Sequence, residues 1–133
     1  MAEQNYGLNT LINDSYWRVR TQVAKQGYGL NILIDDSDWW IRKTVAEQGY
    51  KLDVIINDLD PNVRMEVAKQ GYGLDKLIND YSYIVRAEIA KQGYGLEILI
   101  NDKEEFVRDT VITYCKVHKN KKECKQISIL YNL

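Results

Sequence analysis

Residues 48–69 of the chain read QGYKLDVIINDLDPNVRMEVAK, and this stretch decides the fold. It recurs five times without insertion or deletion, in residues 4–25, 26–47, 48–69, 70–91 and 92–113. A fixed period of this length is typical of solenoids, in which each unit buries its apolar side only against its neighbours. The sequence therefore predicts one array of five repeats, followed by a different C-terminal segment at residues 114–133.

Apolar residues fall at helical spacing in two groups within each copy. In the third copy, Leu52, Ile55 and Ile56 stand at i, i+3 and i+4, which predicts a short first helix of six or seven residues. Val63 and Val67 stand four residues apart and predict a second helix. No stretch shows the period of a β-strand. The pattern therefore predicts an all-α fold, an α-solenoid of short two-helix repeats.

Turn-forming residues mark the helix ends in the same copy. Asp60 is suited to the N-cap of the second helix and Pro61 to its first turn. The glycine after each second helix predicts a C′ residue with positive φ. These glycines are Gly27, Gly49, Gly71 and Gly93. A further glycine stands two residues later in the other copies, but Lys51 replaces it in the third, so we expect no positive φ there.

Asp and Arg recur six residues apart in every copy. The pairs are Asp14 with Arg20, Asp36 with Arg42, Asp58 with Arg64, Asp80 with Arg86, and Asp102 with Arg108. An Asp before a helix can accept backbone N–H bonds, and an Arg inside that helix can pair with its own or the neighbouring Asp. We interpret these residues as a structural ladder between repeats rather than as a charged catalytic row.

The repeat pattern is D-x-x-x-x-[VI]-R-x-x-[VI]-A-x-x-G-x-x-L-x-x-[LI]-[I]. It resembles the HEAT-like repeats, and particularly the leucine-rich variant repeats, over residues 4–113. The resemblance implies a longer and a short helix alternating in a right-handed superhelix. Gln-Gly-Tyr stands where the leucine-rich variant repeats have Asn-Pro, and their N-terminal iron–sulfur cysteines have no counterpart here. HEAT-like proteins mostly bind proteins, and some bind DNA through cationic concave faces.

Positions that differ between copies predict the recognition surface. One set lies in the loop into the second helix and ends with Trp17, Trp39 or Tyr83 in three of the copies. The other set is a stripe on the second helix that faces away from its apolar residues and begins with Arg18 in the first copy. Stacking would place these stripes about 8–10 Å apart. Aromatic residues and Met are enriched in interface cores, so we predict a partner-binding face centred on Trp40, Met65 and Ile84. The full predicted set is Trp17, Trp39, Trp40, Lys43, Met65, Lys69, Tyr83, Ile84 and Phe106. The alternative is that some of these rings pack over adjacent repeats.

The C-terminal segment departs from the repeat and is predicted to form a helical cap. The Gln-Gly that ends the other second helices is missing at Cys115, so the last one is expected to continue to His118. A short helix should follow, with Cys124, Ile127 and Leu130 at a spacing of three covering the last repeat. Both cysteines are expected to be free, partly buried thiols, because the sequence has no secretion signal.

Charge is distributed unevenly along the chain. Residues 1–113 carry 13 Lys and Arg against 18 Asp and Glu, whereas residues 114–133 carry five Lys and one Glu. An acidic repeat body disfavours a phosphate-tracking groove, and the lysines are interpreted as a solvated end. No apolar run approaches the roughly 18–20 residues that span a bilayer. We therefore expect a cytoplasmic protein with no membrane partner.

The sequence indicates binding rather than catalysis. The chain has one histidine, and no nucleophile–base or paired-carboxylate constellation stands apart from the repeating columns. We expect no enzyme activity, no cofactor and no metal site, and predict a protein-binding scaffold. Two alternatives remain open at this point: a nucleic-acid-binding HEAT-like protein, and an inhibitor of a host protein encoded by a phage or mobile element. The residue usage is compatible with an AT-rich bacterial or phage genome.

Overall fold

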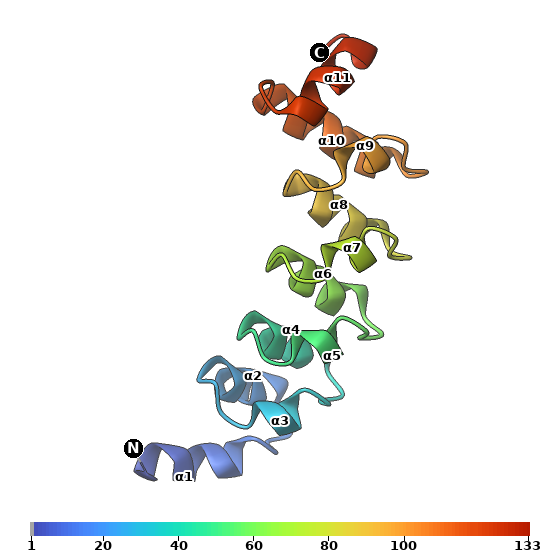
Figure 1. The fold of residues 1–133 in the computed structure, drawn as a ribbon. Helices are drawn as coiled ribbons and strands as arrows, with labels where there is room; N and C mark the ends of the chain where they lie inside the picture. Colours follow the sequence, from blue (N-terminus) through green and yellow to red (C-terminus); the bar gives the residue numbers. More distant parts are fainter. Residues whose placement is uncertain (1) are drawn as a thin grey trace. The chain divides into compact units, whose positions relative to one another are not determined.

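A computed structural model describes residues 2–133 of the chain, with side chains from Gly7 onward. All regular secondary structure in these residues is α-helical, as Figure 1 shows. The all-α prediction is therefore confirmed for this part of the chain. The helices group into two compact units, Met1–Gln70 and Gly71–Leu133, which we call unit 1 and unit 2.

Unit 1 alternates longer and very short helices. Its helices are α1 (Ala2–Leu11), α2 (Trp17–Lys25), α3 (Leu30–Leu33), α4 (Trp39–Glu47), α5 (Leu52–Ile55) and α6 (Pro61–Lys69). The long helix α4 packs between α2 and α6, while α3 and α5 pack beside the long helices (Figure 1). Helices α2, α4 and α6 begin 22 residues apart, so the sequence period is also the period of the packed long helices.

Unit 2 begins with the same alternation and ends differently. Its helices are α7 (Leu74–Leu77), α8 (Tyr83–Lys91), α9 (Leu96–Leu99), α10 (Glu105–Val117) and α11 (Lys122–Tyr131). Helix α8 packs on α10, and α11 packs on both α9 and α10. Helix α10 ends at Val117, with His118 as its C-cap, as the missing Gln-Gly predicts.

The predicted helix ends are confirmed where they rest on specific residues. Asp60 is the N-cap of α6 and its carboxylate accepts the Asn62 amide at 2.8 Å, with Pro61 in the first turn. After the second helices, Gly27 has φ 73° and Gly49 has φ 74°. Only glycine adopts this left-handed region without a steric cost, which explains why the Gln-Gly pair ends α2 and α4.

Lys51 overturns one prediction about the turn. The residue before each short helix does have positive φ, 63° at Gly29 and 44° at Lys51. At this position the chain must reverse direction and start a one-turn helix. The Lys51 carbonyl therefore accepts the amides of both Val54 and Ile55, at 2.9 and 3.0 Å. The lysine of the third repeat thus occupies a backbone conformation that favours glycine.

The first helices are shorter than predicted, and the first repeat is irregular. Helices α3, α5, α7 and α9 have four residues each, not six or seven, because the left-handed residue and the Asn-Asp turn confine them to one turn. In the first repeat, α1 instead runs from Ala2 through Gly7 without a break. Asn5 stands there in place of the C′ glycine, so the local signal that ends a helix is weaker.

The core consists of the apolar columns identified in the sequence. Ile41, Val45 and Ala46 on α4 have no exposed surface, and Val63 and Val67 on α6 are equally buried. Each fully buried Val or Ile side chain contributes roughly 1.5–3 kcal/mol relative to an exposed one. Stacking of the second helices is therefore a main source of stability within unit 1.

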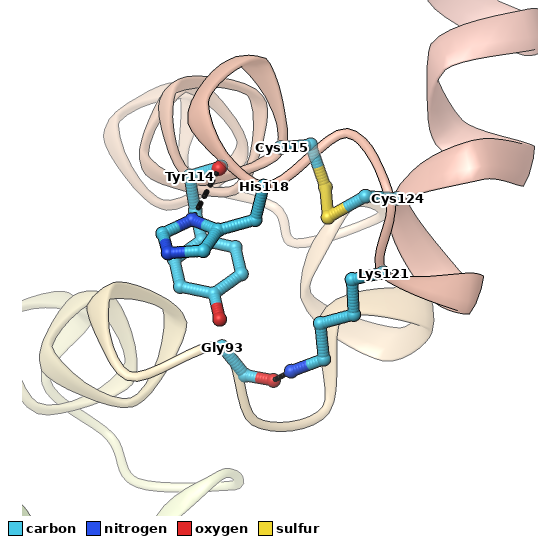
Figure 2. The surroundings of a disulfide bond; sticks show 6 residues. All are labelled: Gly93, Tyr114, Cys115, His118, Lys121 and Cys124. Carbon is cyan, nitrogen blue, oxygen red and sulfur yellow. Dashed lines mark hydrogen bonds between the residues drawn. A yellow bond between two sulfur atoms is a disulfide. The ribbon is translucent and has the colours of Figure 1, made fainter.

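The cap contains a disulfide bond, which overturns the prediction of free thiols. Cys115 on α10 and Cys124 on α11 are bonded, with Cα atoms 4.9 Å apart, and both side chains are fully buried (Figure 2). The bond forms because α11 folds back onto α10, which the spacing of the two cysteines in the sequence does not specify.

Helix α11 is held in place on one side only. Ile127 is buried, as predicted, but Leu130 is exposed, so the predicted apolar seam stops one turn early. Figure 2 shows Lys121 reaching from the start of α11 to the Gly93 carbonyl, which accepts its Nζ at 2.6 Å. The same ammonium lies 5.2 Å from the ring centroid of Tyr114, and the His118 imidazole stacks on that ring at a centroid distance of 3.9 Å.

Candidate functional site

The three tryptophans of the chain gather at the start of two neighbouring helices in unit 1. Trp17 is the first residue of α2, and Trp39 and Trp40 are the first two residues of α4. The Trp40 ring lies 6.4 Å from the Trp17 ring and 5.4 Å from the Trp39 ring, edge-on to both. We call these three residues the tryptophan cluster. Edge-on aromatic pairs at such distances are favourable, so each ring orients the next.

The rings of the tryptophan cluster remain substantially open to solvent. Exposed fractions are 37% for Trp17, 36% for Trp39 and 39% for Trp40. The N-cap of α4 fixes the helix start, because the Asp38 carboxylate accepts the Trp40 amide at 3.0 Å. Packing of α2 against α4 then brings the rings together. Large, adjacent, half-exposed aromatic rings on a rigid helix pair are typical of a binding surface.

Two cations lie directly over these rings. The Arg18 guanidinium carbon is 5.3 Å from the Trp17 ring centroid, and the Lys43 ammonium is 4.8 Å from the Trp40 centroid. Both distances allow a cation–π attraction. The cluster therefore combines apolar surface with positive charge, although the repeat body as a whole is acidic.

Beside the cluster, the variable stripe continues onto α6 as a mixed polar surface. Glu66 on α6 is buried, and its pKa is raised by that burial and by the charge of Glu47 on α4. The positive charges of Lys69 and Lys43 lower the pKa of Glu66 and so oppose this rise. The Gln70 side chain also lowers it, since its Nε2 donates a hydrogen bond to Glu66 at 3.3 Å. Carboxylates are thus interleaved with the lysines next to the tryptophans.

Unit 2 carries a smaller aromatic pair on the equivalent stripe. Tyr83 at the start of α8 and Phe106 near the start of α10 lie 5.8 Å apart, edge to face, and both are exposed. Next to Phe106 is an open, mostly apolar cavity of about 460 Å³ along α10. Its lining includes Lys91, Thr110, Thr113, Tyr114 and Val117.

The structure divides the predicted partner-binding residues between the two units. Trp17, Trp39, Trp40 and Lys43 come together in unit 1, and Tyr83 meets Phe106 in unit 2. Lys69 is exposed at the end of α6, but Met65 and Ile84 are half-buried. Met65 and Ile84 are thus less exposed than the three tryptophans.

Two features of these surfaces were not in the predicted set. Arg18 is outside the predicted partner-binding set, because its cation–π contact with Trp17 depends on side-chain direction rather than on spacing alone. Tyr114 and Val117 line the cavity in unit 2 although they lie beyond the repeat. The signal for them is the missing Gln-Gly, which lets α10 continue past the repeat.

The predicted ladder residues make regular ion pairs to the following repeat. Arg20 donates to Asp36 through Nε at 2.8 Å and Nη2 at 3.1 Å, and its Nη1 donates to the Asp14 carbonyl at 2.7 Å. Arg42 makes the same three bonds to Asp58 and Asp36. In unit 2, Arg86 pairs with Asp102 in the same two-pronged geometry.

These pairs have a structural role in their local setting. Hydrogen bonding to Asp102 raises the pKa of Arg86, against the opposing effect of burial. Burial would raise the pKa of Asp102, but hydrogen bonds from Arg86 and from the Glu104 amide hold it below its ordinary value. Both side chains are only 7% exposed. Each carboxylate also accepts a backbone amide at the start of the next helix, as Asp36 does from Asp38 at 2.9 Å.

The remaining ladder residues keep the local bonds of the pattern. Asp14 accepts the Tyr16 amide and Asp80 accepts the Ser82 amide. Arg64 donates to the Asp58 carbonyl at 2.7 Å, and Arg108 donates to the Asp102 carbonyl at 2.5 Å. Each of these Arg residues therefore reaches back to the carbonyl of the Asp six residues earlier. Arg20, Arg42 and Arg86 also hold the carboxylate of the next repeat's Asp.

Within the described side chains, no group of three or more His, Cys, Asp or Glu is placed to hold a metal ion. Across residues 2–133, no helix is long and apolar enough to cross a membrane. No protein-family model, curated protein or solved structure matches this chain.

Proposed function

We propose that this protein is a non-enzymatic repeat scaffold that binds another protein through the tryptophan cluster. The observation that carries the proposal is the exposed, mutually oriented group of Trp17, Trp39 and Trp40 with Arg18 and Lys43 over its rings. Trp and Arg are the residue types that most often dominate binding energy at protein interfaces. The scaffold belongs, on this proposal, to the α-solenoids of the HEAT-like or leucine-rich variant type.

The solenoid assignment is supported by register and packing. The second helices begin at 22-residue intervals, and within unit 1 α2, α4 and α6 pack in sequence order. Arg20 and Arg42 each bind the Asp of the following repeat, so the same contact joins successive repeats. Such nearest-neighbour contacts are what a solenoid uses in place of a single central core.

The chemistry around the cluster favours an acidic partner segment that carries a bulky apolar residue. A partner side chain can pack on the open edges of the rings, while its carboxylates face the guanidinium of Arg18 and the ammonium of Lys43. Positive charge over the rings would attract an acidic segment and reject a basic one. This complementarity defines the partner by chemistry.

Nucleic acid is less well matched to this surface. Bases stack on open aromatic faces, but here Arg18 and Lys43 already lie over the faces of Trp17 and Trp40. The exposed carboxylate of Glu47 on α4 belongs to the same stripe as Lys43 and would repel phosphates. A protein segment can accommodate such an alternation of charges more readily than a uniformly charged backbone.

The proposal can be tested with peptides of defined composition. All three tryptophans lie in the cluster, so intrinsic tryptophan emission reports binding at this site without a label. A displayed library of random peptides is selected on the full chain, and enriched peptides are synthesised and titrated. We expect peptides with Asp or Glu beside Trp, Phe or Leu, with an emission change on binding and affinity reduced at least tenfold by Trp40→Ala and by Lys43→Glu.

Matched variants separate the cluster from exposed residues elsewhere. Tyr81 is almost fully exposed in a turn of unit 2, so Tyr81→Ala controls for the loss of an exposed aromatic ring. It should leave peptide affinity unchanged. Equal affinity of wild type and both cluster variants would overturn the proposal. Tight binding of single-stranded RNA or DNA that is lost in Trp40→Ala and falls steeply with salt would establish the nucleic-acid alternative instead.

A further inference from the structure

One face of helix α11 is exposed and carries both lysines and branched aliphatic residues. Lys122, Lys125 and Gln126 are exposed, and Ile129 and Leu130 follow at i+7 and i+8 from Lys122 with exposed fractions of 78% and 76%. This spacing places all five residues along one side of the helix. The lysines occupy its N-terminal half and the aliphatic residues its C-terminal half.

The orientation of this face is fixed by the opposite side of α11. Cys124 is bonded to Cys115 and Ile127 is buried, so α11 cannot rotate to cover Ile129 and Leu130 without losing both contacts. Lys121 is anchored on the Gly93 carbonyl at the start of the helix. The exposed aliphatic residues are therefore a stable feature of the cap.

The C-terminal segment carries further lysines. Lys116 in the last turn of α10 and Lys119 between α10 and α11 are exposed as well. Glu123 is the sole acidic side chain of segment 114–133. All these cations are lysines, and the segment contains no arginine. Lysines act as mobile point charges that suit a diffuse anionic surface, whereas arginine is favoured for bidentate contacts to individual phosphates.

We propose that the α11 face docks on the surface of a membrane that contains anionic lipids. With a rise of about 1.5 Å per residue, Ile129 lies roughly 6 Å beyond Lys125 along the helix axis. The aliphatic end can thus enter the boundary between headgroups and acyl chains while the lysines remain at the headgroups, the arrangement of interfacial amphipathic helices. Such peripheral docking needs no membrane-spanning segment, and no described helix is long and apolar enough to be one.

Other anionic partners leave part of this face unexplained. A nucleic-acid backbone would engage the lysines but offers no apolar surface to Ile129 and Leu130. An acidic protein would need a shaped pocket for the exposed side chains of Ile129 and Leu130. The acyl region of a lipid bilayer accepts such residues without a shaped pocket, and its anionic headgroups pair with the lysines at the same time.

The test is co-sedimentation of the full chain with vesicles of phosphatidylcholine alone or with 30% phosphatidylserine or phosphatidylglycerol. We expect binding to both anionic vesicles, little binding to neutral ones, and weaker binding at high salt. Replacing Ile129 and Leu130 by Ser should reduce the partition coefficient more than tenfold. Replacing Lys122 and Lys125 by Gln should reduce it about fivefold per lysine.

Matched variants and a second probe make the outcome decisive. Ile32 and Val54 are comparably exposed in unit 1, and their replacement by Ser should leave vesicle binding unchanged. Tryptophan emission should also stay constant, since the tryptophan cluster lies outside the docking face. Equal sedimentation of wild type and the Ile129→Ser/Leu130→Ser variant would overturn the proposal. Failure of the wild type to sediment with anionic vesicles would also overturn the proposal. If the protein binds an RNA or DNA oligonucleotide and not the vesicles, the lysines serve nucleic-acid binding instead.

Discussion

In unit 2, α8 is joined to the turn before α10 by an ion pair, whereas α10 is joined to α11 by a covalent bond. Arg86 on α8 holds Asp102 with two hydrogen bonds, and Cys115 on α10 is bonded to Cys124 on α11. The first contact recurs in unit 1, where Arg20 holds Asp36 and Arg42 holds Asp58. The second occurs once, after the last repeat.

The difference arises because the last repeat has no following repeat to supply an Asp. An Arg of the ladder needs the Asp that the next repeat supplies 16 residues further on. Arg108 keeps the backbone half of the pattern, its bond to the Asp102 carbonyl, but 22 residues after Asp102 the chain has Cys124. Where the ladder has no next carboxylate, a disulfide ties the last helix to the body. Repetition supplies the contacts inside an array, and the end requires a contact of its own.

Breaking the ladder inside unit 2 should have the largest effect. Arg86→Ala leaves the buried carboxylate of Asp102 and the Asp80 carbonyl without the guanidinium, and loss of one partner of a buried pair costs about 3–5 kcal/mol. Arg108→Ala is the matched control, since it removes a bond to a carbonyl only, and should cost about 1–2 kcal/mol. Urea unfolding of both variants measures the loss in the free energy of unfolding. Equal losses would contradict the distinction between an Arg inside the array and the Arg of the last repeat.

The same pair has a pH signature with a definite sign. The pKa of Asp102 is below its ordinary value of 3.8 in the folded protein, so its contribution is fully present above pH 3.8 and is lost as the pH falls through the folded-state pKa. The stability difference between wild type and Arg86→Ala should therefore be constant near neutral pH and shrink below pH 3.8. A difference that persists unchanged in acid would show that Arg86 acts through packing and not through the charge of Asp102.

Removing the disulfide should have a smaller and more local effect. Replacing Cys115 and Cys124 together by Ala opens a loop with a sequence separation of nine, for which chain entropy predicts a loss of about 2–3 kcal/mol. Because Ile127 and Lys121 are the main other anchors of α11, the amides of α11 should lose hydrogen-exchange protection before those of α8. Reducing agent should reproduce this pattern in wild type and change nothing in the variant. Unchanged protection of α11 in both cases would show that the cap docks without its covalent bond.

Much of the fold could be predicted because it depends on local residues. The N-cap Asp60, Pro61 and the C′ glycines act within one turn of the backbone, and the apolar columns at helical spacing identify the buried face of each second helix. The Arg–Asp relationship was also visible as a spacing, although the carboxylate partner is the Asp of the following repeat. Repetition strengthens such inferences, because the same residue type recurs at the same position in several copies of the repeat.

What could not be predicted depends on contacts that occur once. The bond between Cys115 and Cys124 requires α11 to fold back on α10, and a spacing of nine residues does not specify that. Exposure of Leu130 depends on how α11 is docked, and the periodic pattern alone placed it in the apolar seam. Likewise, Arg18 and Lys43 acquire their role at the tryptophan cluster from the direction of their side chains. Unique contacts have no second copy against which they can be checked.

The smallest expected effect concerns Lys51, which occupies a turn position that is glycine in the neighbouring repeats. Lys51 has φ 44°, where its equivalents Gly29, Gly73 and Gly95 have φ between 60° and 63°. Lys51→Gly removes the strain of a side chain in the left-handed region, partly offset by greater freedom of the unfolded chain, so we expect a gain of about 0.5–1 kcal/mol in urea unfolding. Gly29→Ala is the opposite change and should be destabilising, because an added Cβ would meet Cδ1 of Ile12 at a positive φ. If Lys51→Gly instead lowers stability, then the ammonium of Lys51, 5.4 Å from the Tyr50 ring, contributes more than the backbone strain costs.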